Sequence, residues 1–245
     1  MKQPCPEKIT RRCFLENTAR LYLSAGLCSL FLDFGRAEAS VNAGSGFEPA
    51  YLKLHKTGEL KKRAEELWAI MEDCELCPRR CGVNRHKGKR GVCRAPGTQL
   101  VISAHHPHFG EERPLVGKGG SGTIFLTHCN LRCAFCQNWE IANLGVGSES
   151  NIDDFAGMML ELQEIGCHNI NLVTPTHYSA HIIKAIDVAA EQGLRLPILY
   201  NTSGWERLEI LRLLDGIVDI YLPDFKYWDR GMSAKYSDGA ESYPE

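Results

Sequence analysis

The chain has 245 residues, of which 44% are hydrophobic and 24% are charged, and this is the ordinary composition of a globular protein. The length allows one large domain, or one domain with a small module beside it. The formal net charge of −2 provides no general attraction to nucleic acid or to a membrane surface, so a nucleic-acid partner is not expected.

The first 40 residues differ from the rest of the chain. The segment Thr10–Leu15, with Arg11 and Arg12 at its centre, resembles a twin-arginine export signal, and Ala37–Ala39 could be its cleavage site. The apolar stretch between them, 21–34, is too short and too interrupted for a stable membrane span. A twin-arginine signal would export a folded protein that already carries its cofactor. The alternative is a weakly ordered N-terminal extension.

A linker and a small cysteine-rich module come next. Residues 41–58 are predicted to be a linker, because Gly, Ser and Ala are frequent up to Pro49. From Glu59 to Asp73 apolar residues recur at helical spacing and predict an amphipathic helix. The segment 74–97 is rich in Cys, Gly and Arg. Residues 59–98 are therefore expected to form a helix followed by a metal-binding knuckle.

Residues 99–245 alternate between short apolar strands and helices. After a possible short strand at 100–104 and a glycine-rich loop at 117–122, the pattern predicts strands at 123–127, 169–174, 197–201 and 217–222. Helices are predicted at 151–165, 179–192 and 206–214, the first of them capped by Asn151 or Asp153. This rhythm predicts an α/β fold with a parallel sheet and helical crossovers.

Polar residues follow each of the four strands, where α/β folds collect their chemistry. The chain stops soon after the fourth strand, which would leave an exposed sheet edge. We therefore expect the core domain, 99–245, to lack its C-terminal part. The polar residues at the strand ends are Cys129, Thr176-His177, Thr202-Ser203-Gly204 and Asp224 with Lys226.

The strongest chemical signal is a group of three cysteines directly after the strand at 123–127. Cys129, Cys133 and Cys136 can ligate three irons of a [4Fe–4S] cluster and leave the fourth iron open. The open iron could bind the amino and carboxylate groups of S-adenosylmethionine (SAM), and Phe135 could pack on the adenine. The alternative is a zinc knuckle with His128 as a further ligand, although zinc sites favour C-x2-C pairs and four ligands.

A second group of cysteines precedes the strands. Four thiols with turns at Pro78 and Gly82 could enclose one zinc ion or an auxiliary [4Fe–4S] cluster, and spacing does not decide between the two metals. The chain is too long to need disulfides, so grouped thiols indicate metal ligation. The alternative is four reduced structural thiols. These cysteines are Cys74, Cys77, Cys81 and Cys93, with Arg79, Arg80, Arg85, Lys87, Lys89 and Arg90 around them.

Other polar residues carry weaker signals. The run from His105 to His108, with Glu111 and Glu112, has the composition of a metal site, but we interpret it as a polar loop near the cluster. His177 and Asn201 stand at strand ends and could contact SAM or substrate; each could equally be a satisfied polar residue at the sheet edge.

The motif C-x3-C-x-aromatic-C is the radical SAM signature, and from about Leu54 onward the chain resembles uncharacterised radical SAM proteins of the pyruvate formate-lyase activating enzyme-like group. This resemblance implies a partial (β/α)6 barrel, truncated after about four βα units, that binds SAM across the strand tips. The segments that carry it are 74–96, 106–114, 169–177 and 219–227.

The resemblance also implies roles for individual residues. Asp224 and Lys226 match an Asp-x-Lys of the activating enzymes, which implies SAM contact, although two such residues can also form a surface ion pair. The activating enzymes have a Gly-Gly-Glu segment after the second strand, whereas this chain has Thr174–His177 there. SAM binding is therefore implied more directly than activation of a glycyl radical enzyme.

These observations together predict a radical SAM enzyme that cleaves SAM to a 5′-deoxyadenosyl radical for hydrogen abstraction. Its expected partners are a low-potential electron donor such as flavodoxin or ferredoxin and an unnamed substrate, which could be a protein. SAM and such donors are cytoplasmic, in contrast to the export that the N-terminus suggests. The alternative is a non-catalytic iron–sulfur or zinc protein that transfers electrons or binds a partner.

Overall fold

The computed structural model describes residues 47–243, and these form a six-stranded sheet with helices against it. The predicted export signal at 1–40 and the first residues of the predicted linker, 41–46, lie outside the described residues. In order across the sheet, the strands are β3 (Ser148–Ser150), β1 (Leu100–His108), β2 (Ser121–Leu126), β4 (Ile170–Val173), β5 (Ile198–Thr202) and β6 (Ile220–Pro223).

Strands β2, β4, β5 and β6 run parallel, whereas β1 pairs antiparallel with both β2 and β3. Helices α5 (Ile152–Ile165), α6 (Ser179–Glu191) and α7 (Leu208–Leu214) connect the parallel strands. Helix α5 begins with a capping box, in which the Asn151 side chain accepts the Asp154 N–H at 2.8 Å. Such a cap contributes about 1 kcal/mol. The α/β class and the three crossover helices predicted from the sequence are confirmed.

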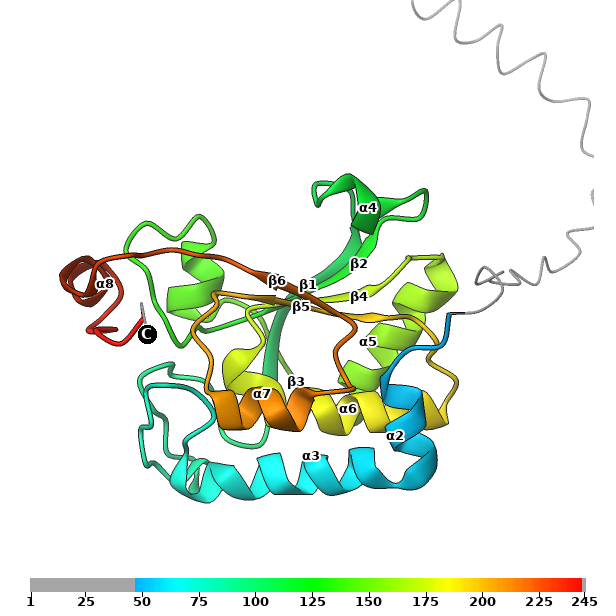
Figure 1. Cartoon of the computed structure of the whole chain (residues 1–245), viewed down its shortest axis with the longest axis horizontal. Helices are drawn as coiled ribbons and strands as arrows, with labels where there is room; N and C mark the ends of the chain where they lie inside the picture. Colours follow the sequence, from blue (N-terminus) through cyan, green and yellow to red (C-terminus); the bar gives the residue numbers. More distant parts are fainter. Residues whose placement is uncertain (1–46, 244–245) are drawn as a thin grey trace, which may run out of the picture. The chain divides into compact units, whose positions relative to one another are not determined.

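Strand residues alternate between the two faces of the sheet. Ile124, Leu172 and Tyr200 belong to the main apolar core together with buried residues of α5, α6 and α7. Figure 1 shows these helices on one face of the sheet, with α3 (Glu59–Ala69) packed beyond them. The hairpin of β1 and β2, which carries the short helix α4 (Arg113–Val116), projects from the opposite face. That opposite face is free to carry a site.

Two predictions in the N-terminal part are corrected by the structure. Helix α2 (Tyr51–Thr57) lies inside the predicted linker 41–58, because Tyr51 and Leu52 are buried and the Tyr51 hydroxyl donates to the Leu196 carbonyl at 3.1 Å. The helix predicted over 59–73 is α-helical only to Ala69, and its last turn is the 3₁₀ helix η1 (Ile70–Asp73).

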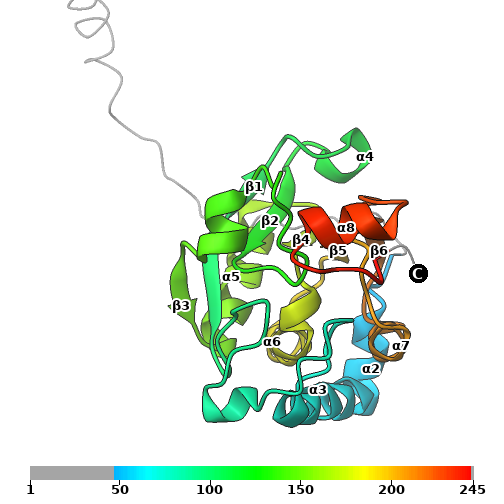
Figure 2. The same ribbon diagram turned by 90° about the vertical axis from the view of Figure 1, so that its left-hand side faces the viewer.

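Two further boundaries and two further elements depart from the sequence predictions. Strand β1 continues to His108 rather than ending near Ala104, since it pairs with β2 along that length. The glycine-rich loop ends at Gly120, and β2 begins at Ser121. Strand β3 and helix α8 (Arg230–Tyr236) have no counterpart in the predicted pattern. Figure 2 shows α8 beside the loop that follows β2.

Within residues 47–243, no helix combines the length and the apolar composition that a membrane crossing requires.

Candidate active site

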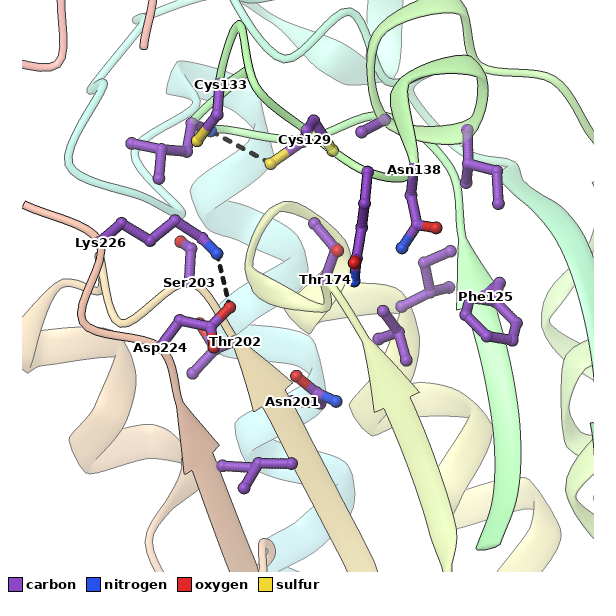
Figure 3. Close-up of a pocket in the computed structure, with 18 of the residues that line it drawn as sticks. Phe125, Cys129, Cys133, Asn138, Thr174, Asn201, Thr202, Ser203, Asp224 and Lys226 are labelled. Atoms are coloured by element: carbon purple, nitrogen blue, oxygen red, sulfur yellow. Dashed lines mark hydrogen bonds and ion pairs between the residues drawn. The ribbon is translucent and has the colours of Figure 1, made fainter. Parts of the chain in front are cut away.

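A cavity of about 800 Å³ lies on the sheet face that the helices leave open. One row of residues across the parallel strands forms its floor. Phe125 pairs with Val173, Val173 with Asn201, and Asn201 with Leu222, and all four line the cavity. Figure 3 shows Asn201 at this floor, with Phe125 and the Asp224–Lys226 pair on opposite sides. The loops after the four strands complete the walls, as expected for the carboxyl ends of parallel strands.

The three-cysteine loop, which follows β2, forms one wall. Cys129, Cys133 and Cys136 all line the cavity, and Cys129 and Cys133 are buried. The loop turns sharply, because the residues flanking Cys129 and Cys133 include His128 and Arg132 in left-handed conformation, with φ of 65° and 59°. The three cysteines therefore line one cavity, from a single loop.

The sulfur atoms of this loop are hydrogen-bonded. The Leu131 N–H donates to Cys129 Sγ at 3.3 Å, and the Ser237 hydroxyl donates to Cys133 Sγ at 3.1 Å. Burial raises the pKa of Cys129 to about 11 and also raises the pKa of Cys136. A free thiol here would stay protonated near neutral pH, so a metal would have to displace its proton on binding.

The segment after β6 encloses this loop, which sequence reasoning missed. The Tyr227 and Ser237 hydroxyls lie 2.7 Å apart, and the Ala134 N–H donates to the Tyr236 carbonyl at 2.7 Å. Tyr227 and Tyr243 join the cysteines in a second apolar cluster. The aromatic residues of the segment were the only signal in the sequence, and they do not reveal what the segment covers.

Asp224 and Lys226 lie just beyond the end of β6, as predicted, and both line the cavity. Lys226 Nζ donates to an Asp224 carboxylate oxygen at 2.6 Å. Burial by itself lowers the pKa of Lys226, but the hydrogen bond and charge of Asp224 outweigh it, so the pKa is raised. The Tyr243 hydroxyl accepts the Lys226 N–H at 2.7 Å and fixes the turn. The pair therefore presents both charges toward the cavity (Figure 3).

Phe135 also lines the cavity, with 59% of its surface exposed, and its ring meets Tyr227 edge-on at 5.8 Å. An exposed aromatic ring at this place can cover a flat ligand. The wall between the strands β4 and β5 contains Thr174, a β-branched residue at φ 61°. This conformation is strained for such a residue and places Thr174 in the cavity wall.

A buried carboxylate supports the cavity from behind. Glu206 Oε1 accepts hydrogen bonds from the hydroxyls of Thr176, at 2.6 Å, and of Thr202, which lines the cavity. Its Oε2 is buried without a hydrogen-bond partner among residues 47–243. Burial raises the pKa of Glu206 from its ordinary 4.5 to about 7. Sequence reasoning missed Glu206, because nothing in its neighbourhood along the chain marks it as buried.

His177 does not reach the cavity, contrary to the prediction that it contacts SAM or substrate. The 3₁₀ turn η4 (Thr176–Tyr178) directs its ring inward, where Nε2 lies 2.9 Å from the Thr127 carbonyl. Its side chain is buried, and burial lowers its pKa to about 3. The sequence left open a satisfied polar residue at the sheet edge as the alternative for His177, but only Nε2 has a hydrogen-bond partner, and the buried Nδ1 has none among residues 47–243. Asn201, in contrast, lines the cavity.

The histidine run at 105–108 is a strand rather than a loop, so its side chains divide between two faces. His105 Nε2 lies 2.8 Å from a Glu161 oxygen on α5, whereas His106 stacks on Phe125 at 5.6 Å between ring centres. His108 reaches the cavity together with Glu111 and Glu112. The run therefore supplies a wall of the cavity.

The four-cysteine segment gathers its thiols at one place. Cys74, Cys77 and Cys93 are buried, and the charges of the other three thiols act on Cys77, whose pKa burial raises. Cys81 Sγ accepts the Val92 N–H at 3.4 Å. A Cβ at Gly91 would lie 2.8 Å from this sulfur, so only glycine allows the chain to close over it.

The donor chemistry of both groups fits a metal, but the thiols are not in ligand geometry. Among residues 47–243, no three His, Cys, Asp or Glu side chains are arranged to hold one metal ion. The cysteines of an iron–sulfur cluster bind different irons, so they need not converge on one point. The three-cysteine loop therefore fits a cluster by its donor set, burial and hydrogen bonds to sulfur. His128, the further zinc ligand considered above, packs against Gly145.

The chain is similar to the uncharacterized protein MJ0674 of Methanocaldococcus jannaschii, with 33% identity over 194 residues. The alignment covers 76% of this chain and 55% of that protein, so the chain spans about half the length of this relative. No protein-family model and no solved structure matches the chain.

Proposed function

We propose that this chain is a radical SAM enzyme in which Cys129, Cys133 and Cys136 hold a [4Fe–4S] cluster, and that its parallel strands form part of a radical SAM barrel. The observation that carries the proposal is one cavity lined by all three thiols of a single loop and by the Asp224–Lys226 pair from another strand end. When bound, the cluster would supply the electron that cleaves SAM to methionine and a 5′-deoxyadenosyl radical, which abstracts hydrogen from a substrate.

The Asp224–Lys226 pair would bind the polar end of SAM. The Asp224 carboxylate can accept hydrogen bonds from an ammonium or ribose hydroxyl, and Lys226 can donate to a carboxylate. The two groups neutralise each other in the absence of ligand, at 2.6 Å. A zwitterionic amino acid group would exchange one ion pair for two and therefore suits this place. Asn201, at the cavity floor, offers one amide donor and one acceptor to the same ligand.

Other residues of the cavity would exclude water and tune the cluster. The Phe135 ring would cover the adenine, since aromatic faces stack on flat heterocycles. The Ser237 hydroxyl and the Leu131 N–H, which already donate to cysteine sulfur, would stabilise negative charge on the ligands. Hydrogen bonds of this kind set the potential of iron–sulfur clusters.

The four-cysteine segment would hold a second metal, either zinc or a [4Fe–4S] cluster. A low-potential donor such as flavodoxin or ferredoxin would reduce the enzyme, and the substrate is a small molecule or a protein. This reaction belongs to a reducing compartment, so we place it in the cytoplasm.

Anaerobic reconstitution with iron and sulfide, followed by dithionite and SAM, tests the function. We expect 5′-deoxyadenosine and methionine from the wild type and none from Cys133→Ala. The matched control is Cys167→Ala, which removes a buried cysteine from the helix side of the sheet and should leave SAM cleavage intact. If Cys133→Ala cleaves SAM as fast as the wild type, the proposed function is wrong.

A non-catalytic iron–sulfur or zinc protein is the competing function, and the four thiols at 74–93, three of which are buried, would suit it equally well. The two functions differ in what SAM does to the cluster. For a radical SAM enzyme, adding SAM should change the electron paramagnetic resonance spectrum of the reduced cluster. An unchanged spectrum, together with absence of 5′-deoxyadenosine, would favour the non-catalytic protein.

A further inference from the structure

One arginine of the four-cysteine segment reaches across to the three-cysteine loop. Arg79 Nε donates to the Asn130 carbonyl at 2.9 Å, and Nη2 donates to the carbonyls of Leu131, at 3.3 Å, and Ser237, at 2.8 Å. Nη1 donates to the Asp238 carbonyl at 2.5 Å. One guanidinium thus holds the backbone of the three-cysteine loop and the end of α8, which are far apart in the sequence.

The same guanidinium is confined on its other side. It lies 4.9 Å from the ring centre of Trp205, which follows β5 and belongs to the apolar cluster around the cysteine loop. Arg79 is also close enough to feel the charges of thiols from both cysteine groups, namely Cys77, Cys81 and Cys129. Arg79 is therefore a cation that lies between the two cysteine groups and hydrogen-bonds to the backbone of the three-cysteine loop.

We propose that Arg79 is a positioning residue that couples the two cysteine groups, because its side chain fixes the three-cysteine loop and places one positive charge between the two sets of thiols. The mechanical part of this coupling is independent of any metal. The electrostatic part rests on the proposed function, since it concerns the potential of a cluster bound by Cys129, Cys133 and Cys136.

Geometry explains why arginine is needed here. The planar guanidinium carries five N–H donors in a fixed fork, and here they serve four carbonyls in different directions. A lysine has its three donors at one nitrogen, so it cannot reach carbonyls that lie in different directions, as the four around this guanidinium do. Hydrogen bonds from a charged donor are stronger than those from a neutral donor, so losing two of them would loosen the loop considerably.

The chain offers a matched control in the next residue. The Arg80 side chain is exposed, and its charge acts on Glu209 rather than on the cysteine loop. Arg79→Lys and Arg80→Lys therefore keep the net charge and change neighbouring positions, but only the first should alter the loop. Strands β4 and β5, whose Leu172 and Tyr200 belong to the main core, report whether either variant is unfolded as a whole.

Hydrogen–deuterium exchange on the full-length protein, as purified, tests the mechanical part. We expect Arg79→Lys to speed exchange about tenfold or more in segments 129–136 and 236–240, with β4 and β5 unchanged, and Arg80→Lys to match the wild type. Exchange equal to wild type in both segments of Arg79→Lys would overturn the proposal. Faster exchange throughout the protein would also overturn it, because Arg79 would then be a general stability residue.

The midpoint potential of the reconstituted three-cysteine cluster tests the electrostatic part. In Arg79→Gln the lost positive charge should lower the potential by about 59 mV, which is a tenfold change in the one-electron equilibrium, whereas Arg79→Lys should shift it less. Equal potentials in wild type and Arg79→Gln would overturn this part. Absence of 5′-deoxyadenosine from the wild type would refute the proposed function instead and would leave the exchange result standing.

Discussion

Replacing Glu206 with glutamine should make the free energy of unfolding less dependent on pH. The expected size of this change follows from the burial of the Glu206 carboxyl. Glu206 Oε1 accepts hydrogen bonds from Thr176 and Thr202, but Oε2 is buried and has no partner within the described part of the chain. Burial disfavours the charged carboxylate more than the two hydroxyls favour it. The pKa is therefore raised from 4.5 to about 7 in the folded protein.

The sign of the effect follows from where the proton is bound. Below pH 4.5 the carboxyl is protonated in both states and has no effect on stability. As the pH rises through the window up to about 7, the unfolded chain releases this proton first, so the folded state becomes less stable. Integrated between pH 5 and pH 8, the loss amounts to about 2.5 kcal/mol.

Urea unfolding of wild type and Glu206→Gln at pH 5 and pH 8, with matched metal content, measures this loss. From pH 5 to pH 8, the free energy of unfolding of the glutamine variant should rise by about 2.5 kcal/mol relative to that of wild type. The contributions of all other titrating groups cancel in this comparison. Glu209→Gln is the control, since Glu209 is exposed and its backbone hydrogen bond lowers its pKa. If the free energies of unfolding of Glu206→Gln and wild type differ by the same amount at pH 5 and pH 8, the reasoning is refuted.

Three further predictions concern the cavity and the metal sites. Asp224→Asn should weaken SAM binding about tenfold by calorimetry without loss of iron, because it removes one charge of the ion pair; unchanged affinity would reduce the pair to a structural contact. Thr174→Gly should raise the free energy of unfolding by about 1 kcal/mol in urea, since it relieves the strain at φ 61°. It should also weaken SAM binding, because a side chain of the cavity wall is lost. A destabilised protein would contradict this prediction. A protein with Cys129, Cys133 and Cys136 all changed to Ala should still hold about one zinc or one four-iron cluster by elemental analysis, and a metal-free triple variant would show that Cys74, Cys77, Cys81 and Cys93 are ordinary thiols.

The βα part of the fold was predictable because its elements are local patterns. Apolar runs such as 170–173 and 198–200 alternate with helices, and α5 has a clear cap at Asn151. The same patterns place Cys129 and Asp224 after strands and Asn201 at a strand end, and parallel pairing then brings strand ends to one edge. Periodicity and topology together are thus sufficient to locate this cavity.

The parts that enclose the cavity were not predictable in this way. Helix α8 and Ser237 contact the cysteine loop through single hydrogen bonds that connect positions about a hundred residues apart, and no local pattern encodes such a contact. His177 shows the converse error. It occurs at a strand end as a functional residue would, but the 3₁₀ turn at 176–178 rotates its ring into the core, and a short turn of this kind leaves little trace in the sequence.

The arginines of the four-cysteine segment show what kind of information is missing. In the sequence, Arg79, Arg80 and Arg85 contribute equally to one basic region around the thiols. In the fold, Arg85 is buried and donates to the His177 and Pro96 carbonyls at 2.7 Å each, Arg80 faces solvent, and Arg79 holds the cysteine loop. The roles of these arginines differ because different backbone carbonyls lie within reach of each side chain. Which carbonyls these are depends on the path of other segments of the chain. A count of charged residues therefore shows that the region is basic, but only the fold shows what each arginine contacts.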